Sequence, residues 1–409
     1  MQRLGLLSML YFHLMLLEKI ADMKFKRAAI LSLSILTIMA TDTVAPLVGQ
    51  ISASFPDVNP TLIKLTITLP SFIMIFFGFI AGQLVRVISK KAVLAIGLSL
   101  YTIGGIAAGW AQTFIGHLIL RAVLGAGTGL IIPLVNSLIA DFYKGKERAD
   151  MIGYSFSVSH MGGVITPPLA VWIGAQNWRT AFLIYAVAPL IFLFSMLFIP
   201  NPPRNTEVNA KRKEPIPTLV IWLSIASFFM VVIFFIIITD IPFLTQTKHT
   251  LAPYVATFGL SVSTFGSTIS GLAFSKVYIR LKKWTVPTGL LIGAFGFLLI
   301  TFTENSVFAL FGLLCTGLGL GLLIALILLL TTNAVGSNDS TAALAVVNSA
   351  FSVGIFVSPF FYALVSGLFS TQPDILLNFQ LASWFFLATG IIAIPAVHFL
   401  MKEKSLEII

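Results

Sequence analysis

The segment GAGTGL, residues 125–130, lies inside an apolar run near residues 115–140, and the similar segment GLGLGL, residues 317–322, lies inside another run near 307–332. Small residues at such spacing let neighbouring helices approach closely within a bilayer. The recurrence of the pattern predicts that two parts of the chain repeat one arrangement of packed helices.

Other matches recur in the same order along the chain, at offsets between 189 and 198 residues. They are Thr41-Asp42 with Thr239-Asp240, the segment from Thr61 with the segment from Thr250, and Gly162 and Pro167 with Gly354 and Pro359. Self-similarity at a near-constant offset is the signature of repeated structural units. The chain is therefore predicted to consist of two similar halves.

Composition places these halves in a membrane. Of the 409 residues, 57% are hydrophobic and only 10% are charged, and the mean hydropathy is +0.99, whereas soluble domains carry about 25% charged residues. Apolar runs of about 20 residues suit a bilayer-spanning helix. Twelve such runs lie near 28–48, 61–84, 92–112, 115–140, 150–174, 180–199, 218–246, 251–274, 285–303, 307–332, 343–369 and 377–400.

The basic residues predict the orientation of these spans. Of the 25 Lys and Arg residues, 21 lie at the two chain ends or in the loops after even-numbered runs. Loops with such an excess of positive charge stay in the cytoplasm, which predicts that both termini are cytoplasmic. The net charge of +10 then reflects orientation and contact with anionic lipid, and it does not predict a nucleic-acid partner.

Breaks between the runs divide the chain into segments. We predict a cytoplasmic amino-terminal segment (1–26), a first six-helix half (27–200), a charged linker (201–217), a second six-helix half (218–402) and a cytoplasmic tail (403–409). Residues 1–22 have no small-residue cleavage site. They form either a helix on the inner membrane face or a stretch preceding a natural start at Met23.

Several functional classes have no support in the sequence. The single cysteine, Cys315, excludes a disulfide framework and a cysteine-based metal site. Neither a nucleotide-binding GxxxxGK[ST] motif nor an HExxH or GxSxG motif occurs. We expect neither an enzyme, nor a metal site, nor a cofactor. Two six-span halves are typical of secondary transporters with a midplane binding site, and we expect an ion gradient to supply the energy.

The chain resembles the major facilitator superfamily from about residue 27 to about residue 400. Arg121, Gly125 and Gly127 match the R-x-x-x-G-x-G pattern of its fourth span, while Asp42 and Pro46 resemble its first-span acid motif. Trp178-Arg179 resembles the entry to its sixth span. The resemblance implies an all-α membrane protein with twelve transmembrane helices in two pseudo-symmetric six-helix halves.

Two motifs match this family only in part. The loop after the second span matches through Gly82, Lys90 and Lys91, but Arg86 stands where the family has an acid. By resemblance these four residues form a cytoplasmic gating loop. The stretch of residues 159–174 resembles the fifth-span antiporter motif through Gly162 and Pro167, with Thr166 in place of a glycine. This second motif is associated with exporters.

The fifth-span stretch also has a physical interpretation. Small residues at Gly162, Gly163 and Thr166 permit close helix packing, and Pro167 bends the helix because it cannot donate a backbone hydrogen bond. A conformational, helix-packing role is predicted for these residues and for Gly125, Gly127, Gly354 and Pro359. The alternative is ordinary tight packing of a bent helix.

Three ionisable residues lie inside predicted spans: Asp42, Arg121 and Asp240. Ionisable groups within a bilayer usually face a cavity or a partner, because burial in hydrocarbon costs about 2.5–3.5 kcal/mol on insertion scales. All three are expected at a similar depth. By resemblance, Asp42 couples protons to transport, Arg121 tunes it, and Asp240 either takes a second proton or contacts a cationic substrate. The alternative for each acid is a static charge pair or a rim position.

Other polar residues in the spans are candidates for the substrate cavity. His160, Asn136, Asn333 and Asn348 offer hydrogen bonds inside apolar runs. Membrane helices also use such residues simply to associate with one another, so each has an equally plain structural interpretation.

These features predict a monomeric, multi-pass transporter in a bacterial inner or plasma membrane. The leading hypothesis is proton-coupled efflux of small amphipathic or drug-like compounds by alternating access. The alternative is a proton symporter or facilitator that imports a small polar nutrient or organic anion. The expected partners are small-molecule substrate, protons and the lipid bilayer.

Overall fold

The computed structural model describes residues 23–201, 216–335, 340–369 and 374–402. Residues 1–22, interpreted either as a surface helix or as a stretch before a start at Met23, lie outside the described residues. So do nearly all of the linker and the tail 403–409. Within the described part every regular element is helical, as the predicted fold class requires.

The first half begins with a helix over residues 23–42. It continues with η1 (Ala45–Leu47), α2 (Val48–Ser54), α3 (Pro60–Ile63), α4 (Leu65–Val87), α5 (Lys90–Ala107), η2 (Ala108–Trp110), α6 (Phe114–Phe142), α7 (Gly145–Ile173), η3 (Trp178–Ala186) and α8 (Val187–Phe198). The second half contains α9 (Thr218–Phe234), α10 (Ile236–Thr247), α11 (Tyr254–Leu281), η4 (Lys282–Trp284), α12 (Thr285–Phe302), α13 (Ser306–Asn333), α14 (Ser340–Phe369) and α15 (Ile375–Lys402).

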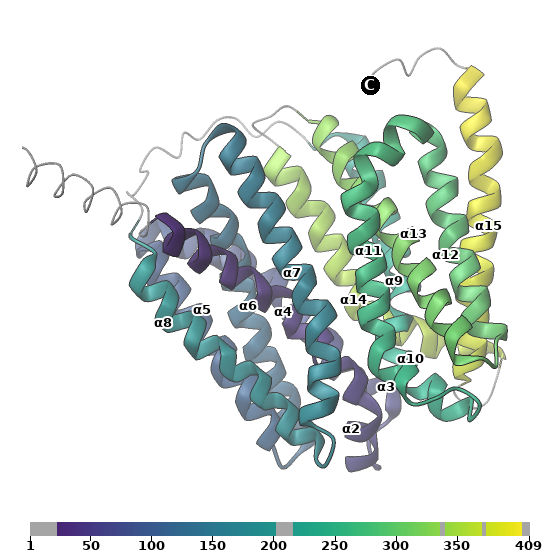
Figure 1. Ribbon diagram of the computed structural model, residues 1–409, viewed down its shortest axis with the longest axis horizontal. Helices are drawn as coiled ribbons and strands as arrows, with labels where there is room; N and C mark the ends of the chain where they lie inside the picture. The colour runs from purple at the N-terminus through teal and green to yellow at the C-terminus, as the bar shows by residue number, and fades with distance from the viewer. Residues whose placement is uncertain (1–22, 202–215, 336–339, 370–373, 403–409) are drawn as a thin grey trace, which may run out of the picture.

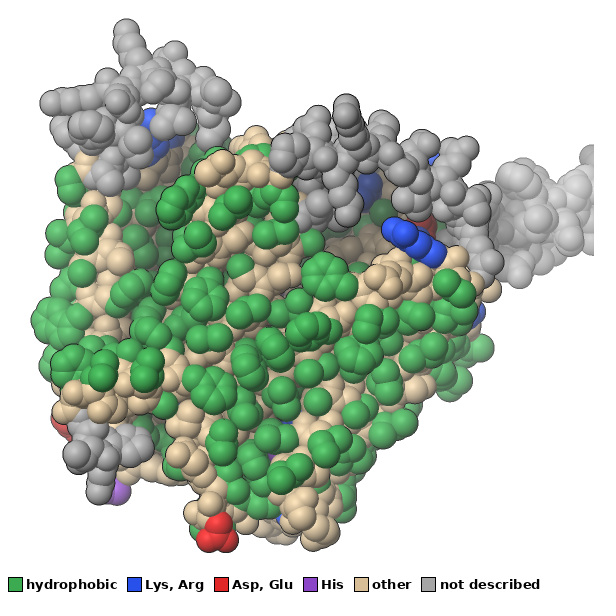
Figure 2. Space-filling model, turned by 180° about the vertical axis from the view of Figure 1, so that it is seen from behind, with side chains coloured by type: hydrophobic (Ala, Val, Ile, Leu, Met, Phe, Trp, Pro, Cys, Tyr) green, Lys and Arg blue, Asp and Glu red, His purple; other side chains and the backbone are tan. Residues whose placement is uncertain are grey.

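The described residues contain a helix at each of the twelve predicted runs. Among the described residues, ten stretches are long and apolar enough to cross a membrane. One of them, Tyr254–Phe302, contains both α11 and α12, and α7 is not among these ten. The number of twelve spans therefore stays a prediction. Large apolar side chains such as Trp172, Leu364 and Phe79 are exposed, and Figure 2 shows hydrophobic side chains spread over the middle of the viewed face. Such a surface suits lipid contact.

In each half, the repeated glycines of one helix pack alternately against two neighbouring helices. A Cβ added at Gly125 or Gly129 of α6 would lie 2.5 Å from a backbone oxygen of α4, and one at Gly127 would lie 2.4 Å from the backbone of α5. Gly317 and Gly321 of α13 abut α11 in the same way, and Gly319 abuts α12. Only glycine permits backbones to approach this closely. The two halves therefore share one packing pattern.

The halves meet along two pairs of helices, with α7 packed against α11 and α4 against α14 (Figure 1). We call the end of the bundle that holds the α4–α5, α6–α7 and α11–α12 connections the basic end, because Lys90, Lys144 and Lys282 lie there. The opposite end, the distal end, holds α2, α3 and the carboxyl end of α10. At the distal end α10 also packs against η1 and α2.

Candidate functional site

A cavity of about 380 Å³ lies between the two halves. The first helix, α4, α6 and α7 line one side, and α9, α10, α11, α13 and α14 line the other. A second cavity of about 250 Å³ shares Met74, Ile132 and Ser352 with it and continues along α4 and α14 toward the basic end. The first-half lining residues are Thr37, Ile38, Ala40, Thr41, Asp42, Pro70, Ser71, Met74, Thr128, Ile132, Phe156 and His160.

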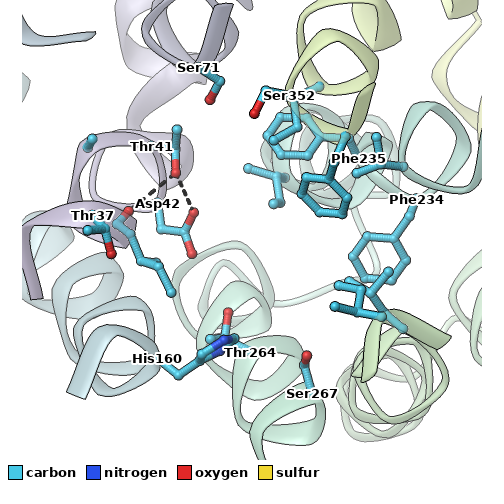
Figure 3. A pocket seen from close by; sticks show the side chains of 18 of the residues that line it. Thr37, Thr41, Asp42, Ser71, His160, Phe234, Phe235, Thr264, Ser267 and Ser352 are labelled. Atoms are coloured by element: carbon cyan, nitrogen blue, oxygen red, sulfur yellow. Dashed lines mark hydrogen bonds between the residues drawn. The ribbon is translucent and has the colours of Figure 1, made fainter. Parts of the chain in front are cut away.

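The wall from the second half is apolar and aromatic, with scattered hydroxyl groups. Phe234 and Phe235 lie across the cavity from Asp42, as Figure 3 shows. The described residues that line the cavity include one carboxylate, Asp42, one imidazole, His160, and neither Lys nor Arg. The cavity therefore offers a single acid within a largely apolar volume. The second-half lining residues are Val231, Phe234, Phe235, Ile238, Leu260, Ser263, Thr264, Ser267, Leu320, Ile324, Phe351, Ser352 and Ile355.

Asp42 is the last residue of the first helix, and its side chain points into the cavity (Figure 3). The residue is only 8% exposed, and the hydroxyl of Thr41 donates a hydrogen bond to Oδ1 over 2.9 Å. In the described part of the chain, neither of the two ion pairs involves Asp42. Its carboxylate is therefore free to exchange a proton or to receive a cationic group.

The backbone break beside Asp42 follows from Pro46. Proline has no N–H, so the carbonyl of Asp42 loses its usual partner four residues on, and the helix gives way to a turn and η1. Irregular backbone inside a membrane protein occurs where neighbouring groups or a cavity satisfy the freed polar atoms. The break thus places Thr41 and Asp42 at the cavity wall.

Arg121 donates hydrogen bonds to backbone carbonyls of the first helix and of α4 instead of pairing with Asp42. Pro70 cannot donate to the carbonyl of Thr66, and Nε of Arg121 donates to that carbonyl over 2.7 Å. One terminal nitrogen donates to the carbonyl of Ala40 over 2.5 Å, and the other to the hydroxyl of Tyr185 over 3.0 Å. The side chain is fully buried in α6. The described contacts of Arg121 include none with Asp42, which speaks against the alternative of a static pair between these two residues. A role of Arg121 in proton coupling stays a prediction.

Asp240 also lies away from the cavity lining. Its carboxylate is fully buried and forms an ion pair with Lys64, which lies between α3 and α4. Lys64 was not among the predicted site residues, although it falls inside the predicted span 61–84. A fourth ionisable residue inside an apolar run was the available signal. The repeated Thr-Asp pairs thus have different surroundings, and coupling through Asp240 stays a prediction.

The four polar candidates for the cavity are scattered. His160 of α7 lines the main cavity, and its ring packs on Phe156 with centroids 4.2 Å apart. Asn348 lines the second cavity. Asn136 and Asn333 are exposed and line neither of the two cavities. Most of the Ser and Thr residues that line the cavity, including Ser71, Thr264 and Ser352, were not predicted. Isolated Ser and Thr residues are common in membrane helices and give no specific signal.

The small residues of α7 lie against the first helix. A Cβ added at Gly162 would lie 2.9 Å from Ile35 Cγ1, and one at Gly163 would lie 3.0 Å from Asp42 Oδ2. Thr166 is buried, and Pro167 lies inside the continuous helix α7. Their counterparts in α14 are Gly354, whose added Cβ would lie 2.3 Å from Val231 of α9, and Pro359.

The loop between α4 and α5 lies at the basic end. Ser89 caps α5 by accepting from the backbone N–H of Ala92, and Lys90 bonds to Asp141 Oδ2 at 2.5 Å and to Ser137 Oγ at 2.6 Å. This ties the start of α5 to the end of α6. Arg86 and Gly82 are exposed, and Lys91 is half-buried. A gating role for these residues stays a prediction.

The sequence profile described as Major Facilitator Superfamily matches residues 30–359, and a second, overlapping match covers residues 223–407. The chain belongs to the major facilitator superfamily. It accordingly shares the all-helical membrane fold of that family, with its two halves around a shared cavity.

Two named bacterial proteins share short matches with the chain. A galacturonate transporter of Dickeya chrysanthemi is 28% identical over 137 residues, which is 33% of this chain and 40% of that protein. The quinolone resistance protein NorA of Staphylococcus aureus is 25% identical over 135 residues, 33% of this chain and 35% of that protein. The matches thus span two fifths or less of these relatives.

Solved structures resemble the whole fold. The crystal structure of a D-xylose–proton symporter superposes with a TM-score of 0.70 at 15% identity, covering 91% of this chain and 96% of that one. A bacterial homolog of the human lysosomal transporter Spinster, inward-facing and unoccupied, gives a TM-score of 0.69 at 16% identity, covering 92% and 95%. At these identities the likeness concerns the fold.

Proposed function

We propose that the protein exports small, amphipathic or lipophilic compounds, cations among them, in exchange for protons by alternating access. The observation that carries this proposal is the single carboxylate, Asp42, in an otherwise apolar and aromatic cavity between the halves. An acid without a basic partner attracts either a proton or a cationic substrate group, and the two compete for it. Such competition couples proton entry to substrate release.

The aromatic wall supports the choice of substrate class. Phe234, Phe235 and Phe351 line the second-half side of the cavity, and aromatic faces attract both apolar groups and cations. The relative named as a quinolone resistance protein supports the same class. The relative named as a galacturonate transporter supports import of an organic anion instead, but an anionic substrate calls for Lys or Arg in the lining.

Proteoliposomes with an imposed pH gradient test this function. We expect gradient-driven movement of ethidium, a lipophilic aromatic cation, and we expect Asp42→Asn to abolish it, because the amide cannot take up or release a proton. Asp57→Asn is the matched control, since Asp57 is exposed and lies outside the cavity lining. The protein should remain folded in both variants.

Radiolabelled galacturonate in the same vesicles tests the alternative. Gradient-driven uptake of galacturonate, without movement of the cation, would refute the export proposal and favour import of a sugar acid. Cation movement that survives Asp42→Asn would retain the substrate class and remove Asp42 from the coupling site. We further propose a cell-membrane location and cytoplasmic termini, in line with the charge distribution, and a monomeric state.

A further inference from the structure

The buried pair of Lys64 and Asp240 joins the two halves at the distal end. Asp240 is fully buried and Lys64 is 7% exposed. Thr239 donates a second hydrogen bond to the carboxylate, at Oδ2 over 2.6 Å, and the ammonium group lies 5.8 Å from the ring centroid of Phe243. Each charge is therefore surrounded by protein and compensated chiefly by the other.

This pair differs from the other ion pair in the described chain. Lys90 and Asp141 belong to α5 and α6, so they move together with one half. Lys64 belongs to the first half and Asp240 to α10 of the second. Around them, α10 packs against η1 and α2, and α14 packs against α3. Any motion that separates the halves at the distal end must therefore pull Lys64 away from Asp240.

Separation of such a pair is unfavourable while the site is dry. Removal of one partner from a buried ion pair leaves an uncompensated charge, which is strongly destabilising. The pair is released only when water reaches both groups or when a proton neutralises Asp240. An ion pair across the interface thus stabilises the distally closed state and not the distally open one.

We propose that Lys64 and Asp240 form a charged latch that holds the two halves together at the distal end, and that distal opening requires its separation. This inference rests on the proposed alternating access but on no particular substrate. It gives Lys64 a positioning role, and it assigns Asp240 to closure of the distal end rather than to the cavity.

Spin labels on the two halves measure this latch directly. Ala53 of α2 and Thr247 of α10 are exposed on elements that pack together across the halves. Cysteines at these positions, with Cys315→Ala, give a distance distribution by double electron–electron resonance in lipid nanodiscs. We expect Lys64→Met or Asp240→Asn to raise the ratio of the longer to the shorter distance about tenfold. Lys90→Met, which breaks the pair within one half, should leave the distribution unchanged.

The double variant Lys64→Met, Asp240→Asn distinguishes a latch from two unrelated effects. If the charges act on each other, the double variant changes the ratio no more than a single one, because non-additivity marks direct coupling. It also leaves neither charge buried alone, so it retains the test where a single variant does not fold. Unchanged distances in all variants, or strictly additive shifts, would overturn the proposal. Failure of ethidium transport alone would leave these distances unaffected and would count against the proposed substrate class only.

Discussion

The substitution Gly163→Ala places one methyl group at the point where the two halves meet beside Asp42. The added Cβ would lie 2.8 Å from Ile38 Cγ2, 3.0 Å from Asp42 Oδ2 and 3.0 Å from Thr264 Cγ2. These atoms belong to the first helix and to α11, so α7 is in contact with both halves here. Ordinary carbon–carbon contacts begin at about 3.5 Å, so the contact with Ile38 must widen by about 0.7 Å.

The magnitude follows from two opposing effects. Overpacking by one carbon costs about 1–3 kcal/mol, while replacement of glycine by alanine inside a helix contributes up to about 1 kcal/mol of stability. Because three atoms crowd the added carbon, the overpacking cost falls in the upper part of its range, about 2–3 kcal/mol. The net penalty is then about 1–2 kcal/mol, a factor of about 5–30 in an equilibrium constant. It acts only on conformations in which α7, Asp42 and α11 are this close. We expect transport to fall by about that factor while the protein remains folded.

Initial rates of gradient-driven ethidium movement in proteoliposomes measure this effect. Gly153→Ala is the matched control, because it lies on the same helix and nothing lies within 4 Å of an added Cβ there. That variant should transport like the wild type and unfold at the same or a slightly higher temperature. Wild-type transport by folded Gly163→Ala would refute the reasoning, since the crowded contact would then have no bearing on the conformational cycle.

Three further substitutions separate structural from functional roles. Arg121→Met removes the hydrogen-bond donor from each of two buried carbonyls, at a cost of about 1–3 kcal/mol each, so the midpoint temperature of thermal unfolding in detergent should fall sharply. An unchanged midpoint together with lost transport would instead support a role in proton coupling. Gly127→Ala drives a Cβ to 2.4 Å from the backbone of α5 and should abolish folded yield by size-exclusion chromatography, whereas Gly82→Ala, with nothing within 4 Å, should not. Lys248→Met removes the ammonium that donates to the carbonyl of Thr301 near the end of α12 over 2.5 Å and to that of Thr303, just beyond the helix, over 3.0 Å. This variant should have a lower unfolding midpoint without loss of transport at saturating substrate.

Much of the fold was predictable because helix packing depends on residue size. Glycines at 125, 127 and 129 recur at 317, 319 and 321, and each set interleaves three helices in the same order. The register of the second spans was not predictable to the residue. The sequence matched Thr61 to Thr250, an offset of 189, whereas the packing relates Pro70 to Ser263 and Met74 to Ser267, an offset of 193. Alignment of identical residues in these apolar helices therefore placed the repeat about one helical turn out of register. The reason is that close backbone contacts constrain the size of a residue and not its identity.

The cavity was predictable in part. Ionisable residues in apolar runs identified Asp42 as a group that needs a cavity or partner, and Pro46 explains why it lies at a helix end. What Arg121 contacts was not predictable, because its partners are carbonyls that only the fold brings near. The free carbonyl of Thr66, which Arg121 satisfies, arises from Pro70 on another helix. Such a contact leaves no pattern at a fixed spacing.

The two acids illustrate how a sequence repeat diverges in function. In both halves a threonine hydroxyl donates to the carboxylate of the next residue, at 2.9 Å for Thr41-Asp42 and 2.6 Å for Thr239-Asp240. The repeat therefore preserves the local structure of the acid. What differs is the residue that arrives from the opposite half, since Lys64 reaches Asp240 and the described chain places no Lys or Arg against Asp42. One buried acid is thus neutralised where the halves meet, and the other is left for a proton or a cation. Because the acids are distinguished by contacts 176 residues apart in sequence, the assignment of separate roles needed the three-dimensional arrangement.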